Sequence, residues 1–95
     1  MKAARRSFSE GGGRFVKYVY LLQSLSHPEQ RYVGLTADIK ARLAAHNAGG
    51  SPHTSKHKPW KLVTLIRFED DSRAAAFEQY LKSGSGRAFA NKHLW

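Results

Sequence analysis

Several side chains spaced along this chain of 95 residues could do chemistry together. Two short tyrosine motifs, Tyr18–Tyr20 and Tyr32–Gly34, are followed by Arg42, by His46 and, far downstream, by Glu78. Phenols and imidazoles transfer protons, a guanidinium binds two phosphate oxygens, and a carboxylate can hold a hard divalent cation. Such a set fits phosphodiester hydrolysis, which needs a base for water, charge stabilisation and help for the leaving oxygen. Each motif is weak alone, so this prediction depends on their order and spacing.

A β-hairpin is predicted to hold the two tyrosine motifs. Residues 16–23 alternate with period two and are rich in aromatic and branched side chains, and residues 31–35 have a similar strand composition. The intervening residues 24–30 contain serine, histidine and proline, which favour a turn. Antiparallel pairing of these strands would bring the two tyrosine motifs side by side.

The next predicted element is a helix over residues 37–47, with Thr36 as its N-cap. It ends near residues 47–50, where two glycines permit a left-handed exit. At 100° per residue His46 falls on the apolar side of this helix, and Arg42 lies on the flank one turn earlier. Arg42 and His46 are therefore expected to project toward the same side.

The second half of the chain predicts a loop, a strand and two helical segments. Residues 51–59, with two prolines, favour an extended loop, and residues 60–68 favour a third strand. Asp70, Asp71 and Ser72 supply helix-start signals, and the buried arc of the helix that follows is predicted to comprise Ala74, Phe77, Tyr80 and Leu81.

Glu78 is expected on the edge of that arc. Residues 83–86 are expected to break the helix. Residues 87–95 could then form a short closing helical turn, in which Phe89, Leu94 and Trp95 are available for packing.

These motifs resemble those of a GIY-YIG nuclease domain of the small standalone type, over about residues 15–94. The same domain type occurs at the start of one of the excinuclease proteins and in phage homing endonucleases. Beside the tyrosine motifs, the resemblance rests on residues 42–46, on residues 58–63 before and in the third strand, and on Glu78 ahead of residues 81–87. It implies an α+β fold with a three-stranded, mixed but mainly antiparallel sheet flanked by helices, in agreement with the β-β-α-β-α-α order above.

Three positions depart from the pattern of the family. Tyr18 stands at the first glycine of the family name, and Val33 stands at the isoleucine of the second motif. Leu35 replaces a lysine that some branches carry, so a catalytic role of that lysine is missing or moved here.

The resemblance implies a catalytic role for each of five residues. Tyr20 is expected to be the general base and His46 its proton acceptor, because a free phenol has a pKa near 10 and needs help to lose its proton. Tyr32 would orient water or phosphate, and Arg42 would stabilise charge. Glu78 would hold one divalent cation, Mg²⁺ or Mn²⁺.

Each of these residues also has a simpler structural interpretation. The tyrosines could be packed strand aromatics, and His46 could be a satisfied histidine at the edge of the core. Arg42 could pair with Asp38 one helical turn away, and Glu78 could pair in the same way with Lys82.

Charge predicts a polyanionic partner. Lys and Arg number 16 against seven Asp and Glu, for a formal net charge of +9, although plain solubility would also favour such a surface. Residues 1–14 are interpreted as a flexible basic tail ahead of one domain, residues 15–95. The partner expected is nucleic acid, with DNA favoured over RNA. His53 is expected to contact this substrate, and Lys56, Lys58 and Lys61 are expected to follow its phosphate backbone. Asn91 is a weak further candidate.

Some classes of site are excluded or disfavoured. The chain has no cysteine, which rules out disulfides and thiolate zinc sites and favours cytoplasmic residence. It has no apolar stretch approaching 18 residues, so no membrane partner is expected.

The sequence therefore predicts a metal-dependent DNA endonuclease that is structure-selective or directed by a protein partner. The alternatives are a catalytically inactive nucleic-acid binding module and an accessory subunit of a DNA repair or RNA-processing assembly. The oligomeric state stays open.

Overall fold

The computed structural model describes residues 16–95, so the predicted basic tail lies outside the described residues. Its elements follow in the predicted order, β-β-α-β-α-α. They are β1 (Lys17–Ser24), β2 (Arg31–Thr36), α1 (Ile39–Asn47), β3 (Trp60–Phe68), α2 (Asp71–Leu81) and α3 (Gly84–His93).

The three strands form one sheet in the order β2-β1-β3. Both pairings are antiparallel, so the predicted hairpin is confirmed and no parallel pair occurs among the described strands. Tyr20 on the central strand lies opposite Gly34 of β2 and Leu65 of β3. The two tyrosine motifs are thus direct neighbours across the hairpin.

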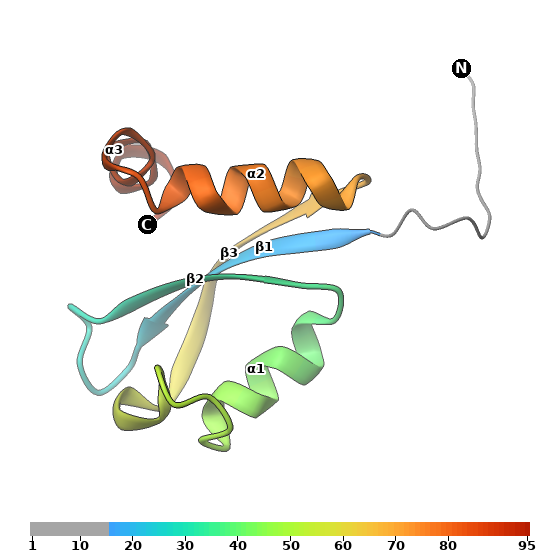
Figure 1. Cartoon of the computed structure of the whole chain (residues 1–95). Helices are drawn as coiled ribbons and strands as arrows, with labels where there is room; N and C mark the ends of the chain where they lie inside the picture. The colour runs from blue at the N-terminus through green and yellow to red at the C-terminus, as the bar shows by residue number, and fades with distance from the viewer. Residues whose placement is uncertain (1–15) are drawn as a thin grey trace.

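Helices cover both faces of the sheet, with α1 on one side and α2 and α3 on the other (Figure 1). Because β1 is central, its side chains enter two separate cores. Val19 and Leu21 pack with the side chains of α2 and α3, while Tyr20 and Leu22 pack with Trp60 and the apolar side of α1. Tyr20 therefore belongs to the α1 side of the sheet.

The start of α1 differs from the prediction. Its N-cap is Asp38, whose carboxylate accepts a hydrogen bond from the backbone N–H of Ala41 at 3.1 Å. Thr36 cannot take that place because it is still paired in the sheet with Tyr18. The glycine exit is confirmed, since Gly49 has a φ of 83°.

The start of α2 is as predicted, with Asp70 as its N-cap, and the predicted burial of Ala74 and Leu81 is confirmed, but that of Tyr80 is wrong. Tyr80 is 40% exposed, whereas Ala74, Glu78 and Leu81 are buried. These three follow the i, i+4, i+7 spacing of a single helical face, and Tyr80 falls outside it. The helix therefore turns a carboxylate inward where an aromatic ring was expected.

The expected break at residues 83–86 is also shorter than predicted. Ser83 is the N-cap of α3, which begins at Gly84, so only residues 82–83 separate the two helices. Gly86 lies within α3, which crosses close to the end of α2. Only a glycine fits there, because a Cβ at this position would overlap the carbonyl of Tyr80. The glycine serves close helix packing here. No helix within residues 16–95 is long and apolar enough to cross a membrane.

Candidate active site

Tyr20 is positioned by a glycine on the neighbouring strand. Its ring lies across Gly34, where an added Cβ would fall far inside van der Waals contact with the phenol carbon and hydroxyl. Tyr20 is 1% exposed and is therefore confined on all sides. The glycine of the second tyrosine motif thus lets the phenol of the first motif cross β2 toward the edge of the sheet.

A chain of buried hydrogen bonds begins at that phenol. The Tyr20 hydroxyl lies 3.0 Å from Nε2 of His46, and Nδ1 of the same ring lies 2.7 Å from the Thr54 hydroxyl. His46 is 1% exposed and Thr54 is fully buried. The indole of Trp60 donates to the Thr54 carbonyl at 2.8 Å, which holds the loop in place. Both ring nitrogens of His46 therefore have a partner.

Thr54 is the functional candidate that the sequence did not reveal. It lies in the loop between α1 and β3, eight residues after His46. The sequence predicted nucleic-acid contacts from the basic side chains of that loop, and a threonine among them matches no motif. Only the fold of the loop over the end of α1 brings its hydroxyl to the imidazole.

Tyr32 joins this cluster from β2. Its ring centroid lies 6.2 Å from that of Tyr20 and 5.0 Å from that of His46. Tyr32 is opposite Leu22 in the hairpin and so faces the same side of the sheet as Tyr20. It is only partly buried, which makes it the member of the three that meets solvent.

The surroundings shift the pKa of Tyr20 and of His46 in opposite directions. Burial, followed by the neighbouring Tyr32 phenol, raises the pKa of Tyr20 to about 12, and the Glu78 carboxylate adds to this rise while Arg42 opposes it. Burial, followed by the charge of Arg42, lowers the pKa of His46 below its usual 6.5. At neutral pH the phenol is therefore protonated and the imidazole is neutral.

Arg42 and Glu78 reach the cluster through their charges. The Arg42 side chain is exposed on α1, and Glu78 is buried on α2. Both charges act on the pKa of Tyr20, Arg42 from α1 on the same face of the sheet and Glu78 from α2 on the opposite face (Figure 1). The structure thus joins Tyr20, Tyr32 and His46 by direct contacts, and relates Arg42 and Glu78 to them through charge.

One of the two simpler ion pairs is also present. Glu78 Oε2 lies 2.6 Å from Lys82 Nζ, one helical turn away. The described residues contain no ion pair between Arg42 and Asp38, because the Asp38 carboxylate caps α1. Glu78 therefore has a structural partner and an electrostatic effect on Tyr20 at the same time.

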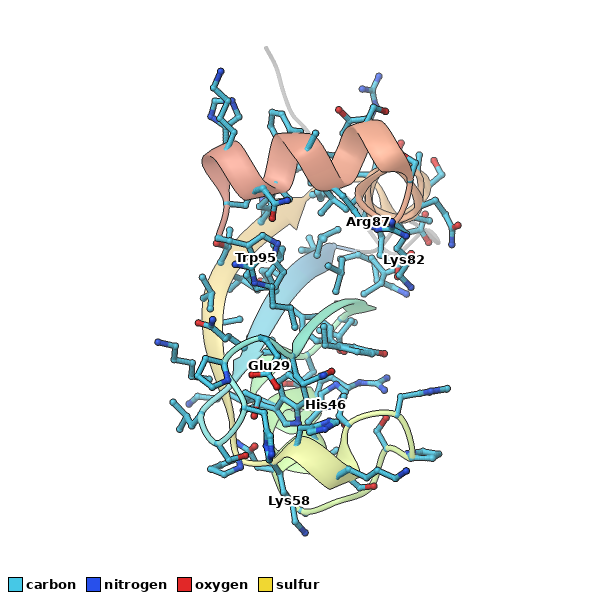
Figure 2. All side chains as sticks on the ribbon, turned by 90° about the vertical axis from the view of Figure 1, so that its left-hand side faces the viewer. Glu29, His46, Lys58, Lys82, Arg87 and Trp95 are labelled. Carbon is cyan, nitrogen blue, oxygen red and sulfur yellow. The ribbon has the colours of Figure 1, made fainter. Side chains whose placement is uncertain are left out.

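The predicted nucleic-acid contacts are spread more widely. His53 and Lys56 are exposed on the loop that carries Thr54. The Lys58 ammonium group lies against Gly49 at the end of α1, below His46 in the view of Figure 2. Lys61 is on β3, the edge strand opposite β2, where it pairs with Gln23. His53, Lys56 and Lys58 thus belong to the loop that carries Thr54, the partner of His46, whereas Lys61 lies on β3.

The donor set fits a divalent cation held partly by substrate. No group of three or more histidine, cysteine or acidic side chains that could hold a metal occurs in residues 16–95, so a closed protein cage is absent there. Mg²⁺ commonly binds through one or two carboxylates and completes its shell with waters and phosphate oxygens. Glu78 is the buried carboxylate that could provide such a ligand.

Comparison with known proteins identifies the family. A family model described as GIY-YIG catalytic domain matches residues 16–92. A UPF0213 protein of Clostridium perfringens is 37% identical over 70% of this chain and 71% of its own length. A UPF0213 protein of Cupriavidus necator is 34% identical over 76% of this chain and 80% of its own length.

A longer relative is similar over the same region. Structure-specific endonuclease subunit SLX1 of Candida dubliniensis is 35% identical over 80% of this chain, which spans only 28% of that relative. These matches confirm the resemblance to the GIY-YIG family that the sequence motifs predicted. The chain belongs to the GIY-YIG catalytic domain family.

Proposed function

We propose that this protein is a metal-dependent endonuclease that hydrolyses DNA phosphodiester bonds around the Tyr20 hydroxyl. The observation that carries the proposal is the buried hydrogen bond between Tyr20 and His46 at 3.0 Å, on which the charges of Arg42 and Glu78 both act. Family membership supports the same class of reaction, as does the name of the Candida relative, a structure-specific endonuclease subunit.

Tyr20 acts as the general base, with His46 as the acceptor of its proton. A phenol with a pKa of about 12 holds very little phenolate at neutral pH, so it needs a partner that takes its proton as it takes one from water. Neutral His46 serves when Nδ1 carries the ring proton and donates to Thr54, because Nε2 is then free to accept from Tyr20.

Substrate binding would strengthen this acceptor. The charge of Arg42 lowers the pKa of His46 and so makes the imidazole a weaker base. A phosphate on the Arg42 guanidinium would offset that charge, and the pKa of His46 would rise. The imidazole would thus become the better acceptor when a phosphodiester is in place, while Arg42 stabilises charge on the phosphoryl oxygens.

The attacking water has to approach the buried Tyr20 hydroxyl from the side on which Tyr32 meets solvent. Tyr20 is 1% exposed, and Tyr32 is the partly exposed phenol of the cluster. We assign to Tyr32 the orientation of the attacking water or of a phosphate oxygen. This division predicts that Tyr32→Phe lowers activity less than Tyr20→Phe, and the reverse order would exchange the two roles.

Glu78 holds one Mg²⁺ or Mn²⁺ ion in this proposal. A bound divalent ion supplies positive charge to the phosphoryl group and to the leaving oxygen. The Lys82 ammonium group occupies Glu78 Oε2, so it competes with a cation for that oxygen.

The DNA path runs over the loop that carries Thr54, with backbone contacts from His53, Lys56 and Lys58. Lys61 would contact DNA only where the substrate extends across the sheet to β3. The protein is structure-selective or directed by a protein partner, which the word subunit in the name of the Candida relative supports. Cytoplasmic residence stays a prediction from the sequence.

Cleavage assays test the proposal. The purified protein is incubated with Mg²⁺ or Mn²⁺ and with duplex, branched and single-stranded DNA and RNA, and the assay is repeated with Tyr20→Phe and Glu78→Ala. We expect each substitution to lower the rate of DNA cleavage by roughly 10²- to 10⁴-fold. Tyr80→Phe is the matched control, because it removes a phenol hydroxyl from an exposed position on α2.

Two results would overturn the assignment. Cleavage that survives both substitutions unchanged would show that the reacting groups lie elsewhere. Salt-dependent binding without cutting under either metal ion would identify an inactive binding module, with a log-log slope of roughly −0.9 per contacted phosphate of duplex DNA.

A further inference from the structure

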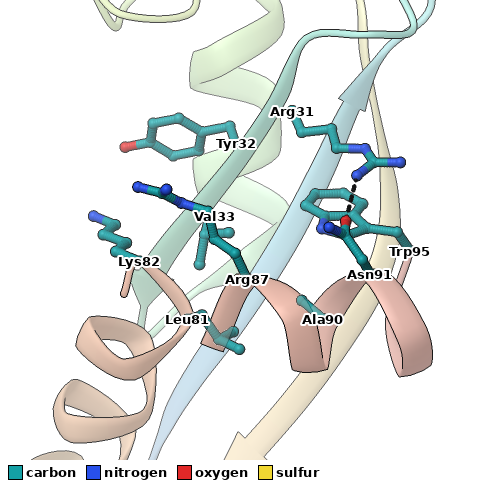
Figure 3. Close-up of a pocket in the computed structure, with 9 residues that line it drawn as sticks. All are labelled: Arg31, Tyr32, Val33, Leu81, Lys82, Arg87, Ala90, Asn91 and Trp95. Atoms are coloured by element: carbon teal, nitrogen blue, oxygen red, sulfur yellow. Dashed lines mark hydrogen bonds between the residues drawn. The ribbon is translucent and has the colours of Figure 1, made fainter. Parts of the chain in front are cut away.

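A pocket of about 440 Å³ lies between the edge strand β2 and the helices α2 and α3. Figure 3 shows its lining, which comes from Arg31 and Tyr32 on β2, from Lys82 after α2, from Arg87 and Asn91 on α3, and from Trp95. We propose that this pocket binds one unstacked nucleotide of the DNA substrate, next to the phosphate that is cleaved. The inference rests on the proposed nuclease function and specifies its substrate as DNA with an unpaired nucleotide at the cleavage site.

The pocket has the size and the surfaces that a nucleobase needs. Small-molecule sites typically enclose about 300–1,000 Å³, so one nucleotide fits within the observed volume. Two partly buried aromatic residues, Tyr32 and Trp95, line it at opposite ends (Figure 3), and the Arg31 guanidinium lies 4.7 Å from the centre of the Trp95 ring. Proteins bind unpaired bases by stacking them on aromatic rings and on guanidinium planes.

A polar group with a defined orientation faces the same space. Asn91 Oδ1 accepts a hydrogen bond from Arg31 Nη1 at 2.9 Å (dashed in Figure 3). This contact occupies the amide oxygen of Asn91 and leaves its NH₂ group as a donor. Carbonyl oxygens and ring nitrogens on the edge of a base are suitable acceptors. Asn91 can therefore contact a base that stacks beside Arg31.

Positive charge is available for the phosphate of the same nucleotide. The Arg87 side chain extends toward the Tyr32 end of the pocket (Figure 3), and Arg87 takes part in neither of the ion pairs formed within residues 16–95. Lys82 lies beside it, but its charge is offset by Glu78. Arg87 is thus the cation best placed to bind phosphate oxygens here.

The pocket and the catalytic cluster share a border. Tyr32 lines the pocket and also contacts His46, while Lys82 lines the pocket and pairs with Glu78. A nucleotide held in the pocket would therefore place its neighbouring phosphate at the cluster. Bases within an intact duplex are stacked and paired, and extracting one costs the free energy of that stacking and pairing. An unpaired nucleotide enters without that cost.

Binding of a short single strand tests the pocket directly. A six-residue thymidine oligonucleotide is titrated into the ¹⁵N-labelled full chain without divalent cation, while the Trp95 indole N–H and Asn91 side-chain NH₂ signals are followed. We expect both signals to shift, and a fully paired blunt-ended DNA duplex at the same phosphate concentration to leave them in place. Trp95→Phe identifies the indole signal.

Matched variants measure the contributions of the ring, the amide and the charge. Trp95→Ala is expected to weaken oligonucleotide binding by roughly 5- to 150-fold, the range for loss of one base stack. Asn91→Ala and Arg87→Ala change exposed side chains and provide the test if Trp95→Ala does not fold. Arg87→Ala is expected to reduce the salt slope by about one contact. Controls are Phe89→Ala, an exposed ring on α3 outside the pocket, and Arg73→Ala on α2.

The results separate the pocket from the proposed reaction. Unchanged Trp95 and Asn91 signals in a protein that still cleaves DNA would overturn the pocket and leave the nuclease function standing. So would an equal loss of affinity in the pocket variants and in the two controls. Shifted signals and selective loss in the pocket variants would support the pocket even if no DNA were cleaved, and the nuclease function alone would then be wrong.

Discussion

The hydroxyl of Tyr20 lies 3.0 Å from Nε2 of His46, and neither side chain is more than 1% exposed. A proton that leaves this phenol therefore passes to a group inside the protein and not to bulk water. The direction of the two pKa shifts is consistent with such a transfer, because the phenol starts protonated and the imidazole starts neutral. This pairing determines how activity should depend on pH.

We expect kcat/KM for DNA cleavage to fall at acid pH with a midpoint below 6.5, because His46 accepts a proton only in its neutral form and its pKa is lowered. Between about pH 7 and pH 10 the value should stay flat, because Tyr20 does not ionise until about pH 12. The measurement is a pH profile of kcat/KM for the unaltered chain and for His46→Gln. The variant should have a much lower kcat/KM, and its pH profile should lack the fall at acid pH (the acid limb). A tenfold rise per pH unit above pH 7 would instead indicate free phenolate as the base.

Thr54 is expected to act as a positioning residue through His46. Thr54→Val removes the hydroxyl that lies 2.7 Å from Nδ1 and leaves that nitrogen unpaired in a buried site. The free energy of unfolding should fall by about 1–3 kcal/mol, and kcat by roughly tenfold. The imidazolium would lose its partner, so the acid limb should move to lower pH. Thr54→Ser keeps the hydroxyl and should restore both values. A loss of stability without any change in the pH profile would assign Thr54 a structural role only.

Gly34 is expected to determine where the Tyr20 hydroxyl lies. A Cβ at Gly34 would overlap the phenol, which is confined and cannot retreat, so Gly34→Ala should displace it. Overpacking of this kind costs about 1–3 kcal/mol of stability, and a displacement of about 1 Å can lower the rate roughly 100-fold. Denaturant unfolding and cleavage assays measure the two effects. Gly84→Ala is the control, because no atom lies within 4 Å of its Cβ position. Full activity of Gly34→Ala would show that the Tyr20 ring is free to move.

Much of this architecture could be predicted from periodicity. The third strand has the bounds predicted from its composition, residues 60–68, because a run rich in branched and aromatic residues with turn signals on each side defines a strand locally. Arg42 and His46 act on the same phenol because they lie one turn apart on a single helix. Relations within one element follow from its geometry and can be read before the fold is known.

Relations between elements could not be predicted in that way. The bond from His46 to Thr54 depends on the path of a loop with no repeating pattern. The inward position of Glu78 depends on which side of α2 meets the sheet, and the aromatic ring of Tyr80 misled the prediction of that side. Gly86 was interpreted as a helix breaker because its close contact with α2 exists only after the two helices pack.

The pair formed by Glu78 and Lys82 allows the metal proposal to be tested with two opposite substitutions. Lys82→Met removes the ammonium group that lies 2.6 Å from Glu78 Oε2 and keeps most of the aliphatic stem. If the lysine competes with a cation, the Mg²⁺ concentration for half-maximal cleavage should fall, by about fivefold if the ion pair contributes about 1 kcal/mol. Glu78→Gln should raise that concentration by more than tenfold, because an amide is a much poorer ligand for Mg²⁺.

The half-maximal Mg²⁺ concentration is the decisive readout, because Lys82 also lines the nucleotide pocket and its loss could change the maximal rate for another reason. Glu69→Gln is the matched control, since it neutralises an exposed carboxylate that pairs with Arg67 outside the candidate site. If Glu78 only formed the ion pair with Lys82, both substitutions would lower stability and leave the Mg²⁺ requirement unchanged. Shifts of that requirement in opposite directions are expected only if cation and lysine compete for the same oxygen of Glu78.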